Sequence, residues 1–307
     1  MRAQWSKAML ELARKDERIF SLTADTIGMP LAEFKQNFPE RFIDVGVAEA
    51  NMVGISAGLA LCGKIPFAAT IAAFASMRCY EQIRTDVCYQ NLNVKIVGVG
   101  AGLKYGVLGA THHAIEDIAI MRALPNMTIV VPADSLETWK ATIALAEHKG
   151  PAYLRLGRAG EPDVYKEDYD FQIGKAVTLR AGDDISIISM GLILPNVLKA
   201  EEKLREKGIK ARVINMHTIK PIDKESILKA GRDTGAIISV EEHNIIGGLG
   251  SAIAEILAEE QLSVPFRRIG LRDLFSGVGT QEQLWEKYGM GASHITNAAE
   301  ELFRSKR

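Results

Sequence analysis

The chain has few cysteines, and their placement excludes two common ways of stabilising a domain. Three cysteines, Cys62, Cys79 and Cys88, occur in 307 residues, and no pair has C-x-x-C spacing. This pattern argues against a zinc site and against a disulfide framework, and it favours a reducing compartment. We therefore expect an intracellular, cytoplasmic protein.

An excess of charge and long apolar runs are also missing. The 37 Lys and Arg residues are balanced by 38 Asp and Glu residues, so binding to the phosphate backbone of nucleic acids is not expected. Lys64 and Pro66 interrupt the longest apolar candidate, which falls short of the roughly 20 residues of a membrane-spanning helix. The N-terminal segment is charged and amphipathic, unlike a signal peptide. We expect a soluble globular protein with no nucleic-acid or membrane partner.

Several well-known signatures of catalysis are absent as well. The sequence contains no P-loop, no G-x-S-x-G elbow, no H-E-x-x-H motif and no clean dinucleotide fingerprint. It also lacks a GDG motif followed some tens of residues later by an asparagine.

Apolar runs of strand length alternate with helical patterns along the chain, which predicts a parallel α/β architecture. Residues 94–102, for example, form a continuous apolar run that is typical of a central parallel strand. At about 150 residues per domain, the length favours two domains. A polar, loop-like stretch interrupts the alternation, and we predict one parallel-sheet α/β domain at 1–165, a linker at 166–185 and a second such domain at 186–307.

Glu49 is the first residue that can carry chemistry. It stands at a predicted strand-to-helix turn among valine, glycine and alanine, and such small residues let a flat ligand approach closely. A carboxylate removed from water there favours its protonated form and can share that proton with a nitrogen base. A helix-capping acid would give the same pattern, so both interpretations stay open.

Two more candidates follow predicted strands. Phe74 comes directly after the strand-like run at 66–71, where an aromatic residue serves more often as core than as a platform for a ligand. The glycine-rich stretch at 98–109 leads to His112 and His113, where α/β sheets bind ligands beyond the carboxyl ends of their strands. Histidine is the usual proton shuttle near neutral pH. Since adjacent residues on a helix point to different faces, we expect one of this pair to face a pocket.

Two further positions suit anions. Arg158 ends the last strand of the first half, where a guanidinium fork suits a phosphate or carboxylate of a substrate, although a surface arginine explains it equally well. In the second half, residues 241–257 place a glycine turn before a helix, which can bind an anion. Its spacing departs from G-x-G-x-x-G, and structural packing is the favoured interpretation there.

Six segments, taken together, resemble one known family. They are DVGVAEANMVGISAGLA, FASMRCYEQIR, GATHHAIEDIAIMRALPNMTIVVPAD, YLRLGR, MHTIKPID and VEEHNIIGGLGSAIAE, in this order along the chain. The sequence resembles the C-terminal half of transketolase, in particular the separately encoded C-terminal subunit of split bacterial transketolases. The resemblance implies a thiamine-diphosphate pyrimidine-binding fold followed by a transketolase C-terminal domain.

The resemblance also implies a cofactor site shared with a second chain. In this family, thiamine diphosphate lies between two chains or protomers, and a separate N-terminal domain with the GDG…N motif holds the diphosphate and Mg²⁺. The present chain lacks that motif. The expected partner is therefore an N-terminal transketolase subunit, with a homodimer of this chain inside an α2β2 complex and no metal ligand contributed by this chain.

Motif positions assign the site residues that the resemblance implies. Glu49 would hydrogen-bond the aminopyrimidine ring of the cofactor, Phe74 would stack on that ring, and His112, in GATH, matches the histidine of the family's GPTH motif near cofactor and sugar. The expected catalytic residues are Glu49 and His112; those expected to bind the cofactor are Glu49, Phe74, Arg78 and Tyr80; those expected to bind the phosphate of a sugar phosphate substrate are Arg158 and Arg2. The count from Phe74 to Arg84 differs by one residue from that of longer transketolases.

Two departures from the family pattern concern the sugar site. Residues 99–102 read VGAG where many transketolases carry Thr-His-Asp-Ser, and Val107-Leu108 stands where they carry Glu-Asp. A histidine and an aspartate that elsewhere bind sugar hydroxyls and phosphate are therefore missing, and such losses change substrate discrimination strongly. The standard pentose phosphates are not implied, and a shorter, deoxygenated or differently substituted ketose or 2-oxo acid stays open.

The expected function is transfer of a two-carbon ketol unit from a (phospho)ketose to an aldose. Three alternatives remain: the beta subunit of a 2-oxo acid dehydrogenase, a synthase resembling 1-deoxyxylulose-5-phosphate synthase, and a non-catalytic relative. The MHTIKPID stretch and Arg158 favour transketolase over the first. Synthases of the second kind carry the diphosphate-binding domain on the same chain, which argues against the second alternative. The joint presence of Glu49, His112 and Arg158 argues against the third.

Overall fold

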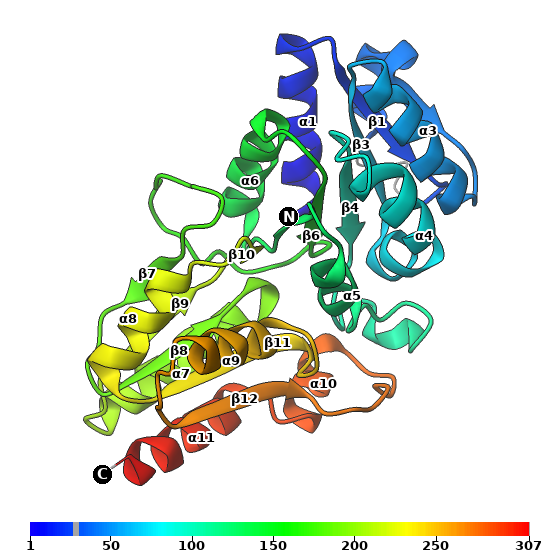
Figure 1. Cartoon of the computed structure of the whole chain (residues 1–307). Coiled ribbons are helices and arrows are strands. Elements are labelled where there is room, and N and C mark those ends of the chain that lie inside the picture. Colours follow the sequence, from blue (N-terminus) through cyan, green and yellow to red (C-terminus); the bar gives the residue numbers. More distant parts are fainter. Residues whose placement is uncertain (27–30, 307) are drawn as a thin grey trace.

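The computed structural model describes residues 1–26 and 31–306, which fold into two halves, each a sheet flanked by helices (Figure 1). The first half contains α1 (Arg2–Lys15), β1 (Ile19–Thr23), α2 (Ala32–Asn37), β2 (Phe42–Asp44), α3 (Glu49–Leu61), β3 (Ile65–Ile71), α4 (Tyr80–Gln82), β4 (Lys95–Val99), α5 (Asp117–Ala123), β5 (Thr128–Val130), α6 (Ser135–Glu147) and β6 (Ala152–Leu156). The second half contains β7 (Val177–Arg180), β8 (Ile185–Ser189), α7 (Leu194–Glu206), β9 (Ala211–Asn215), β10 (Thr218–Lys220), α8 (Lys224–Thr234), β11 (Ile237–Asn244), α9 (Leu249–Glu259), β12 (Phe266–Leu271), α10 (Gln281–Lys287) and α11 (Ala292–Ser305).

Both sheets are parallel apart from one strand each. Over the described residues, the first sheet has the order β10-β5-β6-β4-β3-β1-β2 and the second the order β12-β11-β8-β9-β7. The exceptions are β10, which pairs antiparallel with β5, and β7, which pairs antiparallel with β9. The prediction of two α/β units is confirmed.

Burial on both faces explains why the central strands are continuous apolar runs. Every residue of β4 and β6 is buried, as expected for parallel strands covered by helices on each side. One face of the first sheet packs against α1 and α6, and the other packs against α3 and α5 (Figure 1). Because helices cover both faces of the sheet, a ligand site is expected at the carboxyl ends of these strands.

Two short strands were not expected from the sequence. Strand β7 lies inside the stretch 166–185, expected as a linker, and forms the edge of the second sheet. Strand β10 lies in the second half of the chain but forms the edge of the first sheet. The two halves thus share a sheet, which alternation of apolar runs alone does not predict. The domain limits stay a prediction.

The helical segment that follows β3 is irregular in the structure. Two π-helical turns, Phe74–Arg78 and Ile83–Cys88, flank the short helix α4. A π turn closes one residue later than an α turn and is found mostly as a local bulge, frequently at functional sites. A π turn contains one residue more than an α turn, so this geometry is compatible with a count from Phe74 to Arg84 that differs by one residue from that of longer transketolases.

The segment that leaves the first sheet is held by buried carboxylates of α6. Asp134, the N-cap of that helix, accepts hydrogen bonds from the backbone N–H groups of Val164 and Tyr165 at 2.9 and 2.8 Å. Glu137 accepts bonds from the hydroxyls of Tyr165 and Tyr169 at 2.9 and 2.5 Å and from Asn215 Nδ2. Because Asn215 belongs to β9, this cluster ties the connecting segment to both halves.

A second buried cluster joins the halves at the end of β6. The Arg155 guanidinium bonds both carboxylate oxygens of Asp117, at 2.8 and 3.2 Å. It also donates to the carbonyls of Ala114 in the first half and Glu242 in the second, at 2.9 and 3.1 Å. Arg155 is 3% exposed and Asp117 is fully buried. The glycine-rich loop, helix α5 and strand β11 therefore meet at one guanidinium.

The structure also bears on membrane insertion. Within residues 1–26 and 31–306, no helix combines the length and apolar character needed to cross a bilayer.

Replacing Arg155 by methionine is expected to destabilise the chain strongly, because it leaves the Asp117 carboxylate buried without its cation. The free energy of unfolding should fall by about 3–5 kcal/mol, measured by denaturant titration. The same change at Arg304, whose side chain is 79% exposed and pairs with Glu300, is expected to cost less than about 0.5 kcal/mol. A loss at Arg155 no larger than that at Arg304 would contradict this role.

The cluster at Glu137 predicts a particular pH dependence of stability. Burial raises the pKa of Glu137 from its usual 4.5 to about 7. The folded chain keeps this proton over a pH range in which the unfolded chain has released it, so the free energy of unfolding falls as pH rises from 4.5 to about 7. The slope that one such group contributes is at most about 1.4 kcal/mol per pH unit.

Glu137→Gln removes this titration, so its unfolding free energy should depend less steeply on pH over the same range. Exposed Glu167→Gln serves as the matched control and should follow the original curve. If the pH profiles of Glu137→Gln and Glu167→Gln coincide, the buried carboxyl does not titrate in this window.

Candidate active site

The expected site residues come from four segments that leave the first sheet at the carboxyl ends of its strands. Glu49 is the first residue of α3, after β2, and Phe74 follows soon after the end of β3. His112 stands in the loop after β4, and Arg158 lies just beyond β6. Carboxyl ends of parallel strands meet at one edge of a sheet, so these segments converge where α/β folds bind ligands.

Glu49 and Phe74 are joined by Arg78. Glu49 is buried, 4% exposed, and one of its carboxylate oxygens accepts a hydrogen bond of 3.0 Å from Arg78 Nη1. The same guanidinium lies over the Phe74 ring, with its carbon 3.7 Å from the ring centre. The Arg78 side chain is 49% exposed, so this ion pair lies at the surface on one side. The π turn at Phe74–Arg78 places ring and guanidinium on each other.

His112 connects Phe74 to the glycine-rich loop. Its ring centre lies 5.2 Å from that of Phe74, edge to face, and 5.9 Å from that of Tyr105. The Nδ1 atom of His112 is 2.9 Å from the hydroxyl of Thr111. One ring nitrogen is thus held in place, which fixes how the ring presents its other nitrogen.

The neighbouring histidine has a different environment, although the pair lies in a turn before α5 and not on a helix as expected. His113 is 2% exposed, and its Nε2 lies 3.3 Å from the carbonyl oxygen of Gly106. Burial lowers the pKa of His113, so its ring stays neutral near pH 7. Of the pair, His112 is the one in contact with the other expected site residues.

Arg158 stands at the far end of this group. Its guanidinium carbon is 5.0 Å from the centre of the Tyr105 ring, and its side chain is exposed. Its backbone N–H donates to Glu161 at 2.6 Å, and its carbonyl accepts a bond of 3.3 Å from the backbone N–H of Arg2. Glu161 also pairs with Lys104 at 3.3 Å, and within the described parts of the chain the Arg158 guanidinium forms no ion pair, so it is available to an anion.

Contacts therefore run from Glu49 through Arg78, Phe74, His112 and Tyr105 to Arg158. Two expected residues stand apart. Tyr80 donates its hydroxyl to the carbonyl of Ile120 at 2.9 Å and packs against the apolar core. Arg2 is joined to the series by its backbone. Their assigned roles stay predictions.

Tyr105 was missed by the sequence interpretation. It lies within GLKYGVLG, in a glycine-rich loop, and matches no motif. An aromatic residue inside such a loop after a central strand is the signal that would have found it.

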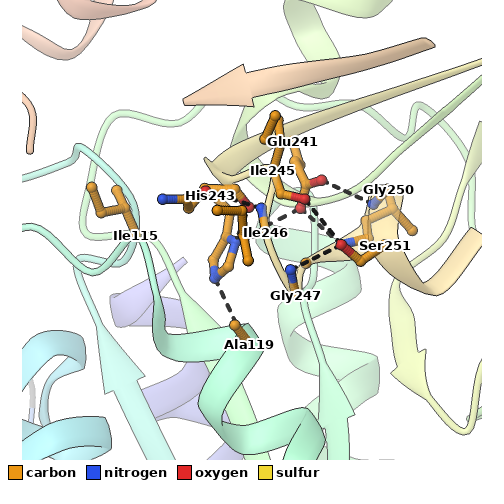
Figure 2. Close-up of polar contacts among 12 residues, drawn as sticks. Ile115, Ala119, Glu241, His243, Ile245, Ile246, Gly247, Gly250 and Ser251 are labelled. Carbon is orange, nitrogen blue, oxygen red and sulfur yellow. Dashed lines mark hydrogen bonds and ion pairs between the residues drawn. The ribbon is translucent and has the colours of Figure 1, made fainter. Parts of the chain in front are cut away.

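The glycine turn before α9 is filled by the chain itself. Glu241 accepts bonds from the backbone N–H groups of Leu249 and Gly250, at 2.7 and 2.9 Å, so a carboxylate already occupies the helix N-terminus (Figure 2). Ser251 accepts a bond from the Gly247 N–H and donates to the carbonyl of Ile245, which closes the turn (Figure 2). This favours the packing interpretation over an anion site.

The residues at this edge suit the ring of thiamine diphosphate, the cofactor implied by the resemblance. A buried carboxylate and an aromatic face lie together at Glu49 and Phe74, which suits a flat nitrogen heterocycle. Among the described residues, the hydrogen bond found for the Glu49 carboxylate is the one that Oε1 accepts from Arg78, and the other oxygen is not fully buried. In that same part of the chain, no group of three or more His, Cys, Asp or Glu side chains is arranged to hold a metal ion. The residues fit the ring of the cofactor and not its metal-bound diphosphate.

Comparisons with known proteins agree with this geometry. Residues 1–161 match the family described as "Transketolase, pyrimidine binding domain", and residues 174–295 match "Transketolase, C-terminal domain". The chain is 44% identical to the 6-deoxy-6-sulfo-D-fructose transketolase subunit SqwH from Clostridium sp. (strain MSTE9), over 100% of this chain and 95% of the relative. It is 43% identical to one of the subunits of apulose-4-phosphate transketolase from Phocaeicola vulgatus, over 99% of this chain and 97% of the relative.

A solved structure described as "Split gene transketolase, inactive beta4 tetramer" matches with a TM-score of 0.93 and 43% identity, over 100% of this chain and 99% of that one. The chain belongs to the transketolase family. It corresponds over its full length to relatives that are named as transketolase subunits, so the expectation of a transketolase-type transferase subunit is confirmed.

Proposed function

We propose that this chain is the C-terminal subunit of a thiamine-diphosphate-dependent transketolase that moves a two-carbon ketol unit from a ketose to an aldose. The observation that carries the proposal is the continuous series of contacts from Glu49 to Arg158 at one sheet edge. It places an acid, an aromatic face, a histidine and a free guanidinium in the order that cofactor, reacting carbon and substrate terminus require.

Each residue has a defined task in this proposal. Glu49 hydrogen-bonds the pyrimidine ring of the cofactor, and Phe74 stacks on that ring. Arg78, which contacts both Glu49 and Phe74, changes its position when the cofactor ring binds. When bound, thiamine diphosphate supplies the group that stabilises the carbanion left by the broken carbon–carbon bond. His112 holds or delivers a proton at the sugar oxygens next to the ring.

Arg158 and Arg2 bind the terminal anion of the substrate. Both named relatives act on sugars that carry an anionic group, a sulfonate in one and a phosphate in the other. A guanidinium matches the geometry of either group, and the exposed Arg158 side chain is free to do so. The substrate is therefore a sugar with a terminal tetrahedral anion.

Mg²⁺ and the diphosphate are assigned to a second polypeptide. The described residues offer no carboxylate or histidine cluster for a metal, and the sequence lacks GDG…N. We place these ligands on an N-terminal subunit, with two copies of each chain in an α2β2 complex in the cytoplasm. The solved relative is described as an inactive β4 tetramer, and a C-terminal subunit that is inactive without its partner fits this arrangement.

The alternatives receive less support. Relatives that match over the full chain and also over at least 95% of their own length are named transketolase subunits, which does not favour a 2-oxo acid dehydrogenase. Purification of the tagged chain from its native cell tests the main proposal: a stoichiometric partner with GDG…N is expected. The resulting complex should consume hydroxypyruvate, a two-carbon ketol donor, in the presence of an aldose. A complex that decarboxylates pyruvate instead would contradict the transketolase proposal and support one of the two pyruvate-type alternatives, the dehydrogenase or the synthase.

Glu49→Gln is expected to remove activity and leave folding intact. The amide keeps the size of the side chain but can neither hold nor give up the proton shared with the ring, so hydroxypyruvate turnover by the complex should fall by at least about 100-fold. Glu225→Gln, a change at a 91% exposed side chain, is the matched control. Equal turnover by the two variants would remove Glu49 from the mechanism, provided circular dichroism shows both folded.

A further inference from the structure

Tyr105 lies between the two ends of the proposed substrate site. Its ring centre is 5.9 Å from that of His112 on one side and 5.0 Å from the Arg158 guanidinium carbon on the other. The residue is 8% exposed. A sugar that reaches from His112 to Arg158 must therefore pass along this ring.

The loop that carries Tyr105 is shaped to hold its ring in one place. Gly100 has a φ of +70°, and a Cβ added there would overlap the Tyr105 ring. On the other side, a Cβ at Gly102, φ +64°, would lie 2.6 Å from the Glu242 carboxylate. Glu242 in turn accepts the Leu103 N–H at 3.0 Å and the Trp285 Nε1–H at 2.9 Å. The ring thus occupies the space that a side chain at position 100 would need.

The Tyr105 hydroxyl is left without a protein partner. It makes no hydrogen bond within residues 1–26 and 31–306, and it is not one of the fully buried unpaired atoms, so solvent reaches this oxygen although most of the side chain is buried. The other tyrosines that are not fully exposed all use their hydroxyls: Tyr80, Tyr153, Tyr165, Tyr169 and Tyr288. A solvent-accessible hydroxyl between His112 and Arg158 can therefore exchange a water molecule for a polar group of a ligand.

The surroundings of Tyr105 define what that ligand is like. The mouth of the loop is apolar, with Val107 and Leu108 exposed by 69% and 50%, and Val278 beside Gly109 exposed by 71%. Next to these exposed apolar side chains, the phenol hydroxyl and the aromatic face of Tyr105 lie between His112 and Arg158. This suits a carbon chain with few hydroxyls between its carbonyl and its terminal anion.

We infer that Tyr105 determines substrate specificity, and that its hydroxyl binds the oxygen substituent next to the terminal phosphate or sulfonate that Arg158 holds. This inference rests on the proposed transketolase function. It adds a residue that neither the motifs nor the family match identifies. In this inference Tyr105 contacts the carbon chain of the sugar and not the cofactor.

The test uses the complex of this chain with its co-purified partner. Hydroxypyruvate serves as donor because it carries no sugar chain, and the acceptors are a matched pair, D-glyceraldehyde 3-phosphate and 2-hydroxy-3-sulfopropanal. Tyr105→Phe removes the hydroxyl alone. The KM for the preferred acceptor should rise about fivefold to tenfold, the range of one lost hydrogen bond, and more than the KM for hydroxypyruvate. The acceptor with the lower KM identifies the anion as phosphate or sulfonate.

Two controls separate this role from a structural one. Tyr89→Phe makes the same chemical change at an 88% exposed tyrosine and should leave both KM values as they were. Because no protein bond is lost, the melting temperature of Tyr105→Phe should match that of the original chain. Tyr105→Leu, which also removes the ring face, should raise the acceptor KM further.

The outcomes distinguish a failure at Tyr105 from a failure of the proposed function. If Tyr105→Phe raises the acceptor KM less than twofold, or raises both KM values equally, the inference about Tyr105 is wrong and the transketolase function stands. If the original complex does not consume hydroxypyruvate at all, the proposed function itself fails. Turnover of hydroxypyruvate with neither anionic aldehyde accepted would overturn the stated substrate class.

Discussion

A guanidinium that is taken out of water must be paired, and Arg155 meets this requirement with groups from three parts of the chain. Asp117, the Ala114 carbonyl and the Glu242 carbonyl satisfy it at the end of β6. Since breaking a buried pair is costly, helix α5, the loop before it and strand β11 are held in one arrangement. The Glu242 side chain extends this arrangement to the Leu103 N–H, so the loop that carries Tyr105 and His112 is positioned from both halves of the molecule.

The site that this arrangement supports is one half of a catalytic centre in our proposal. An acid, an aromatic ring, a histidine and an arginine line one sheet edge, while a metal-binding cluster is missing from the described residues. In our proposal, the remaining ligands come from a second polypeptide. This chain must then keep its own site residues in position without the cofactor. Arg78 does so for the two residues proposed to bind the pyrimidine ring, because it contacts both Glu49 and Phe74.

Much of the fold is predictable from the sequence because buried parallel strands must be apolar along their whole length, as β4 and β6 largely are. Strands β7 and β10 escape prediction because they have four and three residues and alternate or carry polar positions at sheet edges. At the site, motif order pointed to Glu49, Phe74, His112 and Arg158, which the structure places in one series. It did not point to Tyr105, whose ring occupies the space that a side chain at Gly100 would need. Nor did it predict that the Tyr80 hydroxyl donates its hydrogen bond to the Ile120 carbonyl. Such facts depend on three-dimensional contacts.

The most direct test of the shared site is calorimetric titration of thiamine diphosphate, with Mg²⁺ present, into this chain alone, into its co-purified partner alone and into the equimolar mixture. The account predicts saturable binding by the mixture at one cofactor per pair of chains, and binding at least about tenfold weaker by either chain alone, a difference of about 1.4 kcal/mol. Binding by this chain alone that is as tight as binding by the mixture would contradict the claim that a second polypeptide completes the site.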